Sequence, residues 1–310
     1  MAYLVCLSLI FTSFVLFWGA DSCNFHMRAV MKAHSICRGG LYPRSQVQRF
    51  DVPDDKVAWK VDFPEYKPPL YNSLTLEGKS YADPKLGTPG FAPKWNTLDN
   101  EVNRASYEGA YSLDAEGYPL NPRGRTGLRG HGLLGRWGPN HAADPIVTRW
   151  KRNKEGEIMN NPTSDKPIMQ LVVVQRRDNK EWALPGGMVD PGEKVSATAV
   201  REFLEEATNS LHMTDDEKLM VDLSLKEFFS KGEEVLCSYV DDPRNTDNSW
   251  METTAFSFHD ESGDTLKYVA LNAGDDAVGV KWIDLHREMA LYATHRDFVE
   301  KVARIKYCHW

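Results

Sequence analysis

Three carboxylates within five residues are the part of this sequence best suited to chemistry. Glu202, Glu205 and Glu206 stand at positions i, i+3 and i+4, so on a helix they share one patch of surface. Like charges at this spacing repel by about 0.3 kcal/mol per pair. A divalent cation removes that repulsion, because carboxylate and carbonyl oxygens suit Mg²⁺ or Mn²⁺, and such ions hold substrate phosphates. The cluster therefore predicts a metal site for a phosphate-containing substrate.

The surrounding residues predict the elements that position these acids. A strand ends at Leu184, Gly186 and Gly187 break it, and a turn at 190–192 leads into a helix that begins near Ser196. We expect the carbonyl of Gly187 to be an added metal ligand. The helix is amphipathic and is expected to point its acids away from the core. Its apolar side chains are Val200, Phe203, Leu204, Ala207 and Leu211.

The same stretch resembles the Nudix box, G-x5-E-x7-R-E-U-x-E-E-x-G-U, in which U is an apolar residue. Gly187, Glu193, Arg201 and the three glutamates occupy its glycine and charged positions. The match fails only at its end, where Thr208 and Asn209 replace a glycine and an apolar residue. An isolated E-x-x-E-E is more often a solvated helix face. Here the glycines, Glu193 and Arg201 coincide with it, which favours the functional interpretation.

Composition places limits on both fold and function. At 310 residues, 42% hydrophobic and 26% charged, the chain is typical of a globular protein with one large or two smaller domains. The net charge of −7 argues against nucleic-acid binding, and an anionic substrate needs a metal or a local group of arginines. The five cysteines show no C-x-x-C spacing, so neither a zinc site nor a disulfide framework is expected. We expect a monomer.

The first fifty residues carry two conflicting targeting patterns. Residues 1–26 are an apolar segment, without a charged side chain from 2 to 20, which is typical of a secretory signal or a membrane anchor. Residues 27–50 contain arginines and a lysine but no acid, as in a mitochondrial transit peptide. Mitochondrial and secretory targeting both stay open, and no stable membrane association is expected after processing.

Residues 51–144 are rich in Pro, Gly, Trp and Tyr and show no helical period. We expect short strands and ordered loops there, forming a small cap that covers substrate. Gly78-Lys79-Ser80 lacks the first glycine of a phosphate-binding Walker loop. The G-x-G-x-x-G pattern of Gly130, Gly132 and Gly135 is followed by no helix, so we reject a dinucleotide-binding fold.

Residues 145–310 are expected to form the hydrolase domain. Alternating and continuous apolar runs predict a mixed sheet with helices on both faces, which is the α/β/α sandwich that the Nudix resemblance implies. The expected strands lie at 168–175, 181–184, 234–240, 251–259 and 278–283, and further helices at 216–229 and 286–307.

Three other stretches narrow the substrate. Residues 124–145, 241–253 and 291–295 are similar to the family of mitochondrial-type ADP-ribose pyrophosphatases and to the ADP-ribose-sensing domain of melastatin-type cation channels. The resemblance implies these nucleotide-binding candidates: His141, Asp242, Arg244, Leu291, Thr294 and His295. Each also has a plain structural alternative: His141 capping a turn, Asp242 and Arg244 pairing around Pro243, and His295 packing in the core.

The resemblance further implies Mg²⁺-dependent, or Mn²⁺-dependent, hydrolysis of ADP-ribose to AMP and ribose 5-phosphate. The implied metal ligands are Glu202, Glu205, Glu206 and Gly187, with Arg201 and Glu193 as a pair bracing the loop. The general base stays open among Glu205, Asp247, Glu252, Asp275 and Asp276. The alternatives are an ADP-ribose sensor without turnover, whose known examples have lost box acids, and a Nudix hydrolase for another nucleoside diphosphate.

Overall fold

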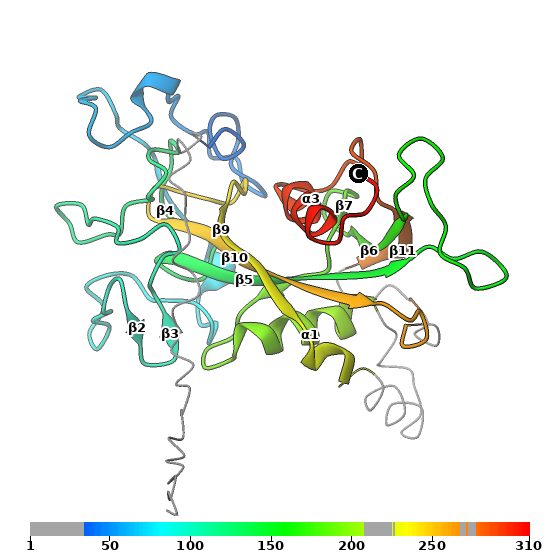
Figure 1. Cartoon of the computed structure of the whole chain (residues 1–310). Helices are drawn as coiled ribbons and strands as arrows, with labels where there is room; N and C mark the ends of the chain where they lie inside the picture. The colour runs from blue at the N-terminus through cyan, green and yellow to red at the C-terminus, as the bar shows by residue number, and fades with distance from the viewer. Residues whose placement is uncertain (1–33, 208–224, 226, 267–270, 272–276) are drawn as a thin grey trace, which may run out of the picture. The chain divides into compact units, whose positions relative to one another are not determined.

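The structure is a computed structural model that describes residues 34–207, 225, 227–266, 271 and 277–310 (Figure 1). For Glu206 and Ala207 it describes the backbone alone. The named elements, with η marking 3-10 helices, are η2 Asp54–Lys56, β1 Leu70–Asn72, η3 Leu74–Leu76, β2 Leu98–Asp99, β3 Val102–Asn103, β4 Arg129–Gly132, β5 Gly138–Trp150, β6 Met169–Arg176, β7 Trp182–Ala183, β8 Gly187–Met188, α1 Val195–Ala207, β9 Glu233–Val240, β10 Ser249–Asp260, β11 Ala277–Asp284 and α3 His295–Ile305.

The centre of the fold is a mixed sheet in the order β11-β6-β5-β10-β9. Strands β5 and β10 run parallel, and the other neighbours are antiparallel. The short strands β7 and β8 join at β6 and β5, so the segment that leads into the box lies along the middle of the sheet. Strand β5 runs without a break through residue 144, so the cap and the hydrolase region share this strand.

Side-chain alternation along β6 divides the core into two layers. Leu171 and Val173 pack on one face with residues of α3, whereas Val172 and Val174 pack on the other face with α1. Figure 1 shows α1 and α3 on opposite sides of the sheet. The predicted α/β/α sandwich with a mixed sheet is therefore confirmed, and α1 buries its apolar side through Phe203.

Most of the predicted elements of the hydrolase region are present within two residues of their expected bounds. The predicted closing helix at 286–307 is wrong at its start, because α3 begins only at His295. Residues 286–294 form a loop in which Ala293 adopts a φ of 48°. Of the predicted helix at 216–229, residues 225 and 227–229 are helical and the others lie outside the described residues.

The cap is built from short strands and loops, as expected. Strand β1 pairs with β4 in parallel, and β2 pairs with β3. The glycines of the rejected dinucleotide pattern serve close packing: Gly130 has a φ of 97°, and an added Cβ would lie 2.2 Å from the carbonyl oxygen of Tyr71. Strand β5, and no helix, follows this pattern.

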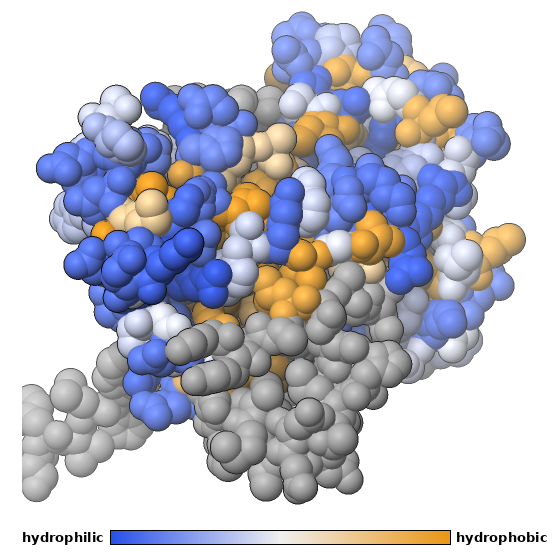
Figure 2. Space-filling view, turned by 90° about the vertical axis from the view of Figure 1, so that its right-hand side faces the viewer, coloured by the Kyte–Doolittle hydropathy of each residue, from blue (hydrophilic) through white to orange (hydrophobic). Residues whose placement is uncertain are grey.

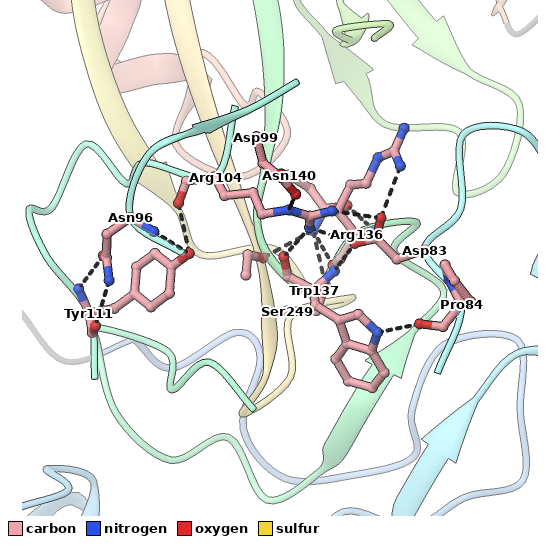
Figure 3. A network of polar contacts seen from close by, with 11 residues as sticks. Asp83, Pro84, Asn96, Asp99, Arg104, Tyr111, Arg136, Trp137, Asn140 and Ser249 are labelled. Atoms are coloured by element: carbon pink, nitrogen blue, oxygen red, sulfur yellow. Dashed lines mark hydrogen bonds and ion pairs between the residues drawn. The ribbon is translucent and has the colours of Figure 1, made fainter. Parts of the chain in front are cut away.

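Buried arginines hold the loops of the cap together. Arg104 donates to Asp83 and Asp99 (Figure 3), at 2.7 and 3.0 Å to Asp83 and at 3.0 Å to Asp99. Its side chain is 3% exposed. Arg125 donates to the backbone carbonyls of four residues, 56, 58, 59 and 61. Paired buried charges and satisfied carbonyls replace the helices and sheets that would otherwise fix such loops.

Residues 34–50 of the expected basic segment belong to the folded body. Cys37, Tyr42 and Arg49 are buried, and the carboxylate of Asp241 accepts the backbone N–H groups of residues 35–37. Within the described part of the chain, no helix is long and apolar enough to cross a membrane. The apolar segment 1–26 lies outside that part. Figure 2 shows hydrophobic residues on one face in separate patches among hydrophilic ones.

Candidate active site

Two adjacent glycines, Gly186 and Gly187, allow the loop of the box to pass closely between two carboxylates. A Cβ added to Gly187 would lie 2.2 Å from Oε1 of Glu202, and one added to Gly186 would lie 2.1 Å from Oδ1 of Asp144. Gly187 also pairs with Ala143 in strand β5, which fixes the loop against the sheet. The glycines are therefore required by the close approach of acid side chains, one from α1 and one from β5.

Arg201 connects the acids of the box. Its Nε and Nη2 donate to Glu193 at 3.1 Å each, and its Nη1 donates to Glu202 at 2.8 Å and to Glu205 at 3.2 Å. Nη2 also donates to the carbonyl of Met188 at 3.1 Å, so one guanidinium joins helix α1 to the loop. These hydrogen bonds lower the pKa of Glu193 to about 2, which keeps it ionised.

Glu202 is the most enclosed of the described acids in the box. Its side chain is 12% exposed and lies against Gly187 of the loop, so it points away from the core but is not open to solvent. Burial raises its pKa, and the negative charges of Glu205 and Glu193 raise it further, although Arg201 opposes them. Glu205 is 54% exposed.

These residues fit a hard divalent cation. Carboxylate oxygens of Glu202 and Glu205 share one guanidinium, and the excess negative charge around Glu202 is of the kind that such a cation would balance. Among the described side chains, no group of three acidic, histidine or cysteine residues already converges on one point. The side chain of Glu206 lies outside that description.

We expect Glu193→Gln to lower the free energy of unfolding at neutral pH by about 1–2 kcal/mol, because a charge-assisted pair with Arg201 is lost. The pKa of Glu193 falls from 4.5 to about 2 on folding, so this stabilisation is present above pH 4.5 and is lost as the pH falls toward 2. Urea denaturation of both proteins at several pH values measures the difference. A difference that does not shrink between pH 5 and pH 2.5 would contradict this assignment.

The loop before α3 is fixed to the strand that leads into the box. Tyr292 donates its backbone N–H to the carbonyl of Trp182 at 2.8 Å, and Leu184 donates its N–H to Nδ1 of His295 at 3.0 Å. Burial lowers the pKa of His295, which fits a neutral ring accepting at Nδ1. Leu291 packs against the core layer under α3. Oγ1 of Thr294 is buried without a hydrogen-bond partner among the described residues.

Asp242 and Arg244 form the pair considered as a structural alternative. Arg244 donates from Nε and Nη2 to the two carboxylate oxygens at 2.8 Å each, and Asp242 is 1% exposed. The hydroxyl of Tyr292 donates to the same carboxylate at 3.1 Å. The side chain of Arg244 is 32% exposed. The structure thus brings Asp242, Arg244 and residues 291–295 into one group next to Leu184.

His141 lies apart from that group, within strand β5 and opposite Glu252 of β10. It therefore caps no turn, and that alternative is wrong. The ring of Tyr107 lies 4.9 Å from the imidazole, and Nε2 is buried without a hydrogen bond to a described residue, 3.6 Å from Glu252. Glu252 is fully buried and accepts from Ser106 Oγ, Tyr107 N and Trp250 Nε1 at 2.5–2.7 Å.

These contacts separate the candidates for the general base. Glu252 accepts from Ser106 and Tyr107 of the cap and from Trp250 of its own strand β10, so it ties the cap to the sheet. Asp247 is 1% exposed and accepts from Tyr66 and Thr126, and burial raises its pKa to about 6. Asp275 and Asp276 lie outside the described residues. Glu205 is the described candidate that is both in the box and exposed.

Three residues near the site were missed by the sequence analysis: Asp144, Arg176 and Tyr292. Asp144 is buried beside Gly186 and accepts from Thr253 Oγ1 at 2.8 Å, and burial raises its pKa. Arg176 lies over the ring of Tyr292, with 4.3 Å from Cζ to the ring centroid. Asp144 and Tyr292 both lie within the stretches that carried the substrate resemblance, so the resemblance could have pointed to both as site residues.

The fold and the box define the class of protein: this chain belongs to the Nudix hydrolase family. Residues 158–302 match the NUDIX domain, and residues 52–138 match the NUDT9-like, N-terminal domain. The chain is 48% identical to "ADP-ribose pyrophosphatase, mitochondrial" of Rattus norvegicus over 93% of its length and 85% of the relative. It is 47% identical to "Putative nudix hydrolase 6" of Caenorhabditis elegans, over 86% and 95% of the two chains.

The similarity extends to a cation channel. The chain is 35% identical to "Transient receptor potential cation channel subfamily M member 2" of Mus musculus over 89% of its own length, and it spans 18% of that channel. Both resemblances expected from the sequence are therefore confirmed.

Proposed function

We propose that this protein hydrolyses the diphosphate bond of ADP-ribose in a Mg²⁺-dependent reaction that yields AMP and ribose 5-phosphate. The observation that carries the proposal is the joining of two groups of residues by one short segment. Gly187, at one end of the segment 184–187, lies against Glu202 of the box. Leu184, at the other end, is bonded to His295 beside the pair of Asp242 and Arg244. The relative named as an ADP-ribose pyrophosphatase supports this choice of substrate.

In this proposal the two groups divide the work. Glu202, Glu205, Glu206 and the carbonyl of Gly187 hold the metal, while the pairing of Arg201 with Glu193 fixes the loop that carries Gly187. Bound Mg²⁺ supplies a Lewis acid that offsets negative charge on the phosphate oxygens. The second group, Asp242, Arg244, Leu291, Thr294 and His295, binds the nucleotide, and His141 lines the cap side.

The proton acceptor for the attacking water is assigned to Glu205. It is 54% exposed, whereas Glu252 and Asp247 are buried and already accept hydrogen bonds from the cap. A base must reach the water whose proton it takes. Glu205 accepts one hydrogen bond from a described residue, Arg201, and as an exposed member of the metal-binding acids it can reach such a water.

The direct test is incubation of the purified protein with Mg²⁺ and a panel of nucleotides, followed by chromatographic separation of the products. The panel holds ADP-ribose, a dinucleotide polyphosphate and a sugar nucleotide. We expect ADP-ribose to be consumed with equal amounts of AMP and ribose 5-phosphate. If another nucleotide of the panel is cleaved efficiently and ADP-ribose is not, the assigned substrate is wrong, although hydrolysis of a diphosphate bond still holds. Binding of ADP-ribose without turnover would favour a sensor.

We further propose that the protein acts in mitochondria, because its relative from Rattus norvegicus is named as mitochondrial. Imaging of the full chain with a C-terminal fluorescent tag against a mitochondrial marker tests this. Passage of the tagged chain into the secretory pathway would contradict it. A monomer stays a prediction.

A further inference from the structure

Arg176, the last residue of β6, contacts Tyr292, which lies in the loop that carries part of the group assigned to nucleotide binding. Its guanidinium covers the ring of Tyr292 at 4.3 Å. Alongside the larger effect of burial, its positive charge lowers the pKa of Asp144 and of His295. None of the motifs found in the sequence contains Arg176.

Arg176 and Arg244 are held in the same way. Arg176 donates from Nε and Nη2 to the two carboxylate oxygens of Asp178 at 3.0 and 2.8 Å, and Arg244 donates from the same two atoms to Asp242. In both residues Nη1 makes no hydrogen bond to a described residue. The two side chains are 28% and 32% exposed, so neither is fully enclosed by the protein.

Tyr292 links the two arginines. Its ring packs under Arg176, and its hydroxyl donates to the carboxylate that orients Arg244. The two guanidinium groups repel each other. An arginine whose orientation is fixed by a bidentate carboxylate is prepared to bind an anion with little further loss of side-chain freedom, and phosphate matches the planar donor geometry. Two such groups linked through one tyrosine form a candidate anion site, which a chain of net charge −7 needs for an anionic substrate.

We propose that Arg176 is a further substrate-binding residue that, together with Arg244, contacts a phosphate group of the nucleotide. This inference rests on the proposed function, because it places the phosphate of ADP-ribose at these two residues. It adds a binding contact from β6 to those of the metal ligands on α1.

The competing interpretation is that Arg176 only supports Tyr292 and the turn at Asp178. The two interpretations differ in which ligands they affect. A phosphate contact weakens binding of ADP-ribose and AMP and leaves adenosine unchanged. Loss of packing under Tyr292 weakens all three alike.

Isothermal calorimetry on the full chain separates these outcomes, with the Glu206→Gln substitution present throughout to suppress turnover. We expect Arg176→Ala to weaken ADP-ribose and AMP about 10- to 100-fold, Arg176→Lys to weaken them less, and adenosine binding to be unaltered. Arg304→Ala is the matched control, since Arg304 is also held by a carboxylate, that of Glu300, but is 74% exposed on α3. It should change no affinity.

Affinity for ADP-ribose within twofold in Arg176→Ala would overturn the inference, as would equal weakening of adenosine. If Arg176→Ala fails to fold, Arg176→Lys gives the same comparison. Turnover by Arg176→Ala is measured in parallel without the Glu206→Gln substitution. We expect KM for ADP-ribose to rise and kcat to stay nearly unchanged. The wild-type protein could instead bind ADP-ribose and AMP through Arg176 without hydrolysing ADP-ribose. That result would overturn the proposed function and leave the phosphate contact of Arg176 standing.

Discussion

Replacing Glu202 by glutamine is expected to lower kcat/KM for ADP-ribose by about 10³-fold, which corresponds to about 4 kcal/mol of lost transition-state stabilisation. Glu202 is enclosed against Gly187 and its side chain is 12% exposed, so a neutral amide removes a charged metal ligand from the part of the box nearest the loop. The amide oxygen can still accept from Arg201, so the fold should be retained.

Glu300→Gln is the matched control for this substitution. Glu300 also accepts from an arginine, Arg304, but it lies on α3, away from the box. Steady-state kinetics with Mg²⁺, together with thermal unfolding of each variant, separate chemistry from stability. We expect Glu206→Gln to behave like Glu202→Gln. Nearly native turnover in both variants would mean that the acids of α1 do not hold the reactive metal.

Gly187→Ala is expected to reduce turnover about 100-fold while changing the free energy of unfolding by about 1 kcal/mol or less. The three atoms nearest the added Cβ all belong to the carboxylate end of Glu202, at 2.2–2.5 Å, and that flexible end can rotate away. The φ of Gly187 is not positive, so the backbone accepts alanine. The protein would then fold with its metal ligand displaced.

Gly186→Ala is the comparison that isolates this effect. Its Cβ would meet Oδ1 of Asp144 at 2.1 Å and the backbone carbonyl of Ala143 at 2.9 Å, and a buried strand yields less than the end of a side chain. We therefore expect Gly186→Ala to lower stability by about 1–3 kcal/mol. Urea denaturation and kinetics on both variants check the pair. A native kcat in Gly187→Ala would show that turnover does not require Glu202 in the position seen in the structure.

The central part of the fold could be predicted because its signals are local. The spacing that placed a helix near Ser196 is the spacing that buries Phe203, and the apolar runs of β6, β9 and β10 fill a sheet covered on both faces. The contact between Arg201 and Glu193 spans eight residues of one motif, so a family pattern can anticipate it.

The start of α3 could not be predicted in the same way. Residues 286–294 contain no glycine or proline, and their composition favours a helix. The chain instead binds β7 through Tyr292 and enters α3 at His295, whose ring accepts from Leu184 more than a hundred residues earlier. Tertiary contacts of this kind override local helix propensity, and the local sequence does not predict them.

The same reason accounts for the residues that were missed. Asp144 matters because Gly186 passes beside it, and Arg176 matters because Tyr292 lies under it, and both partners are distant in sequence. The cap is a further case, since Arg125 fixes a loop some 64 to 69 residues away through backbone carbonyls that carry no residue identity.

The central claim is that acids of helix α1 hold a divalent cation beside the loop of Gly187. Electron paramagnetic resonance of Mn²⁺ tests it directly, because the signal of free Mn²⁺ falls when the ion is bound. We predict a loss of free signal on adding the wild-type protein, and a much smaller loss with the Glu202→Gln, Glu206→Gln double variant. Equal binding of Mn²⁺ by both proteins would contradict the account.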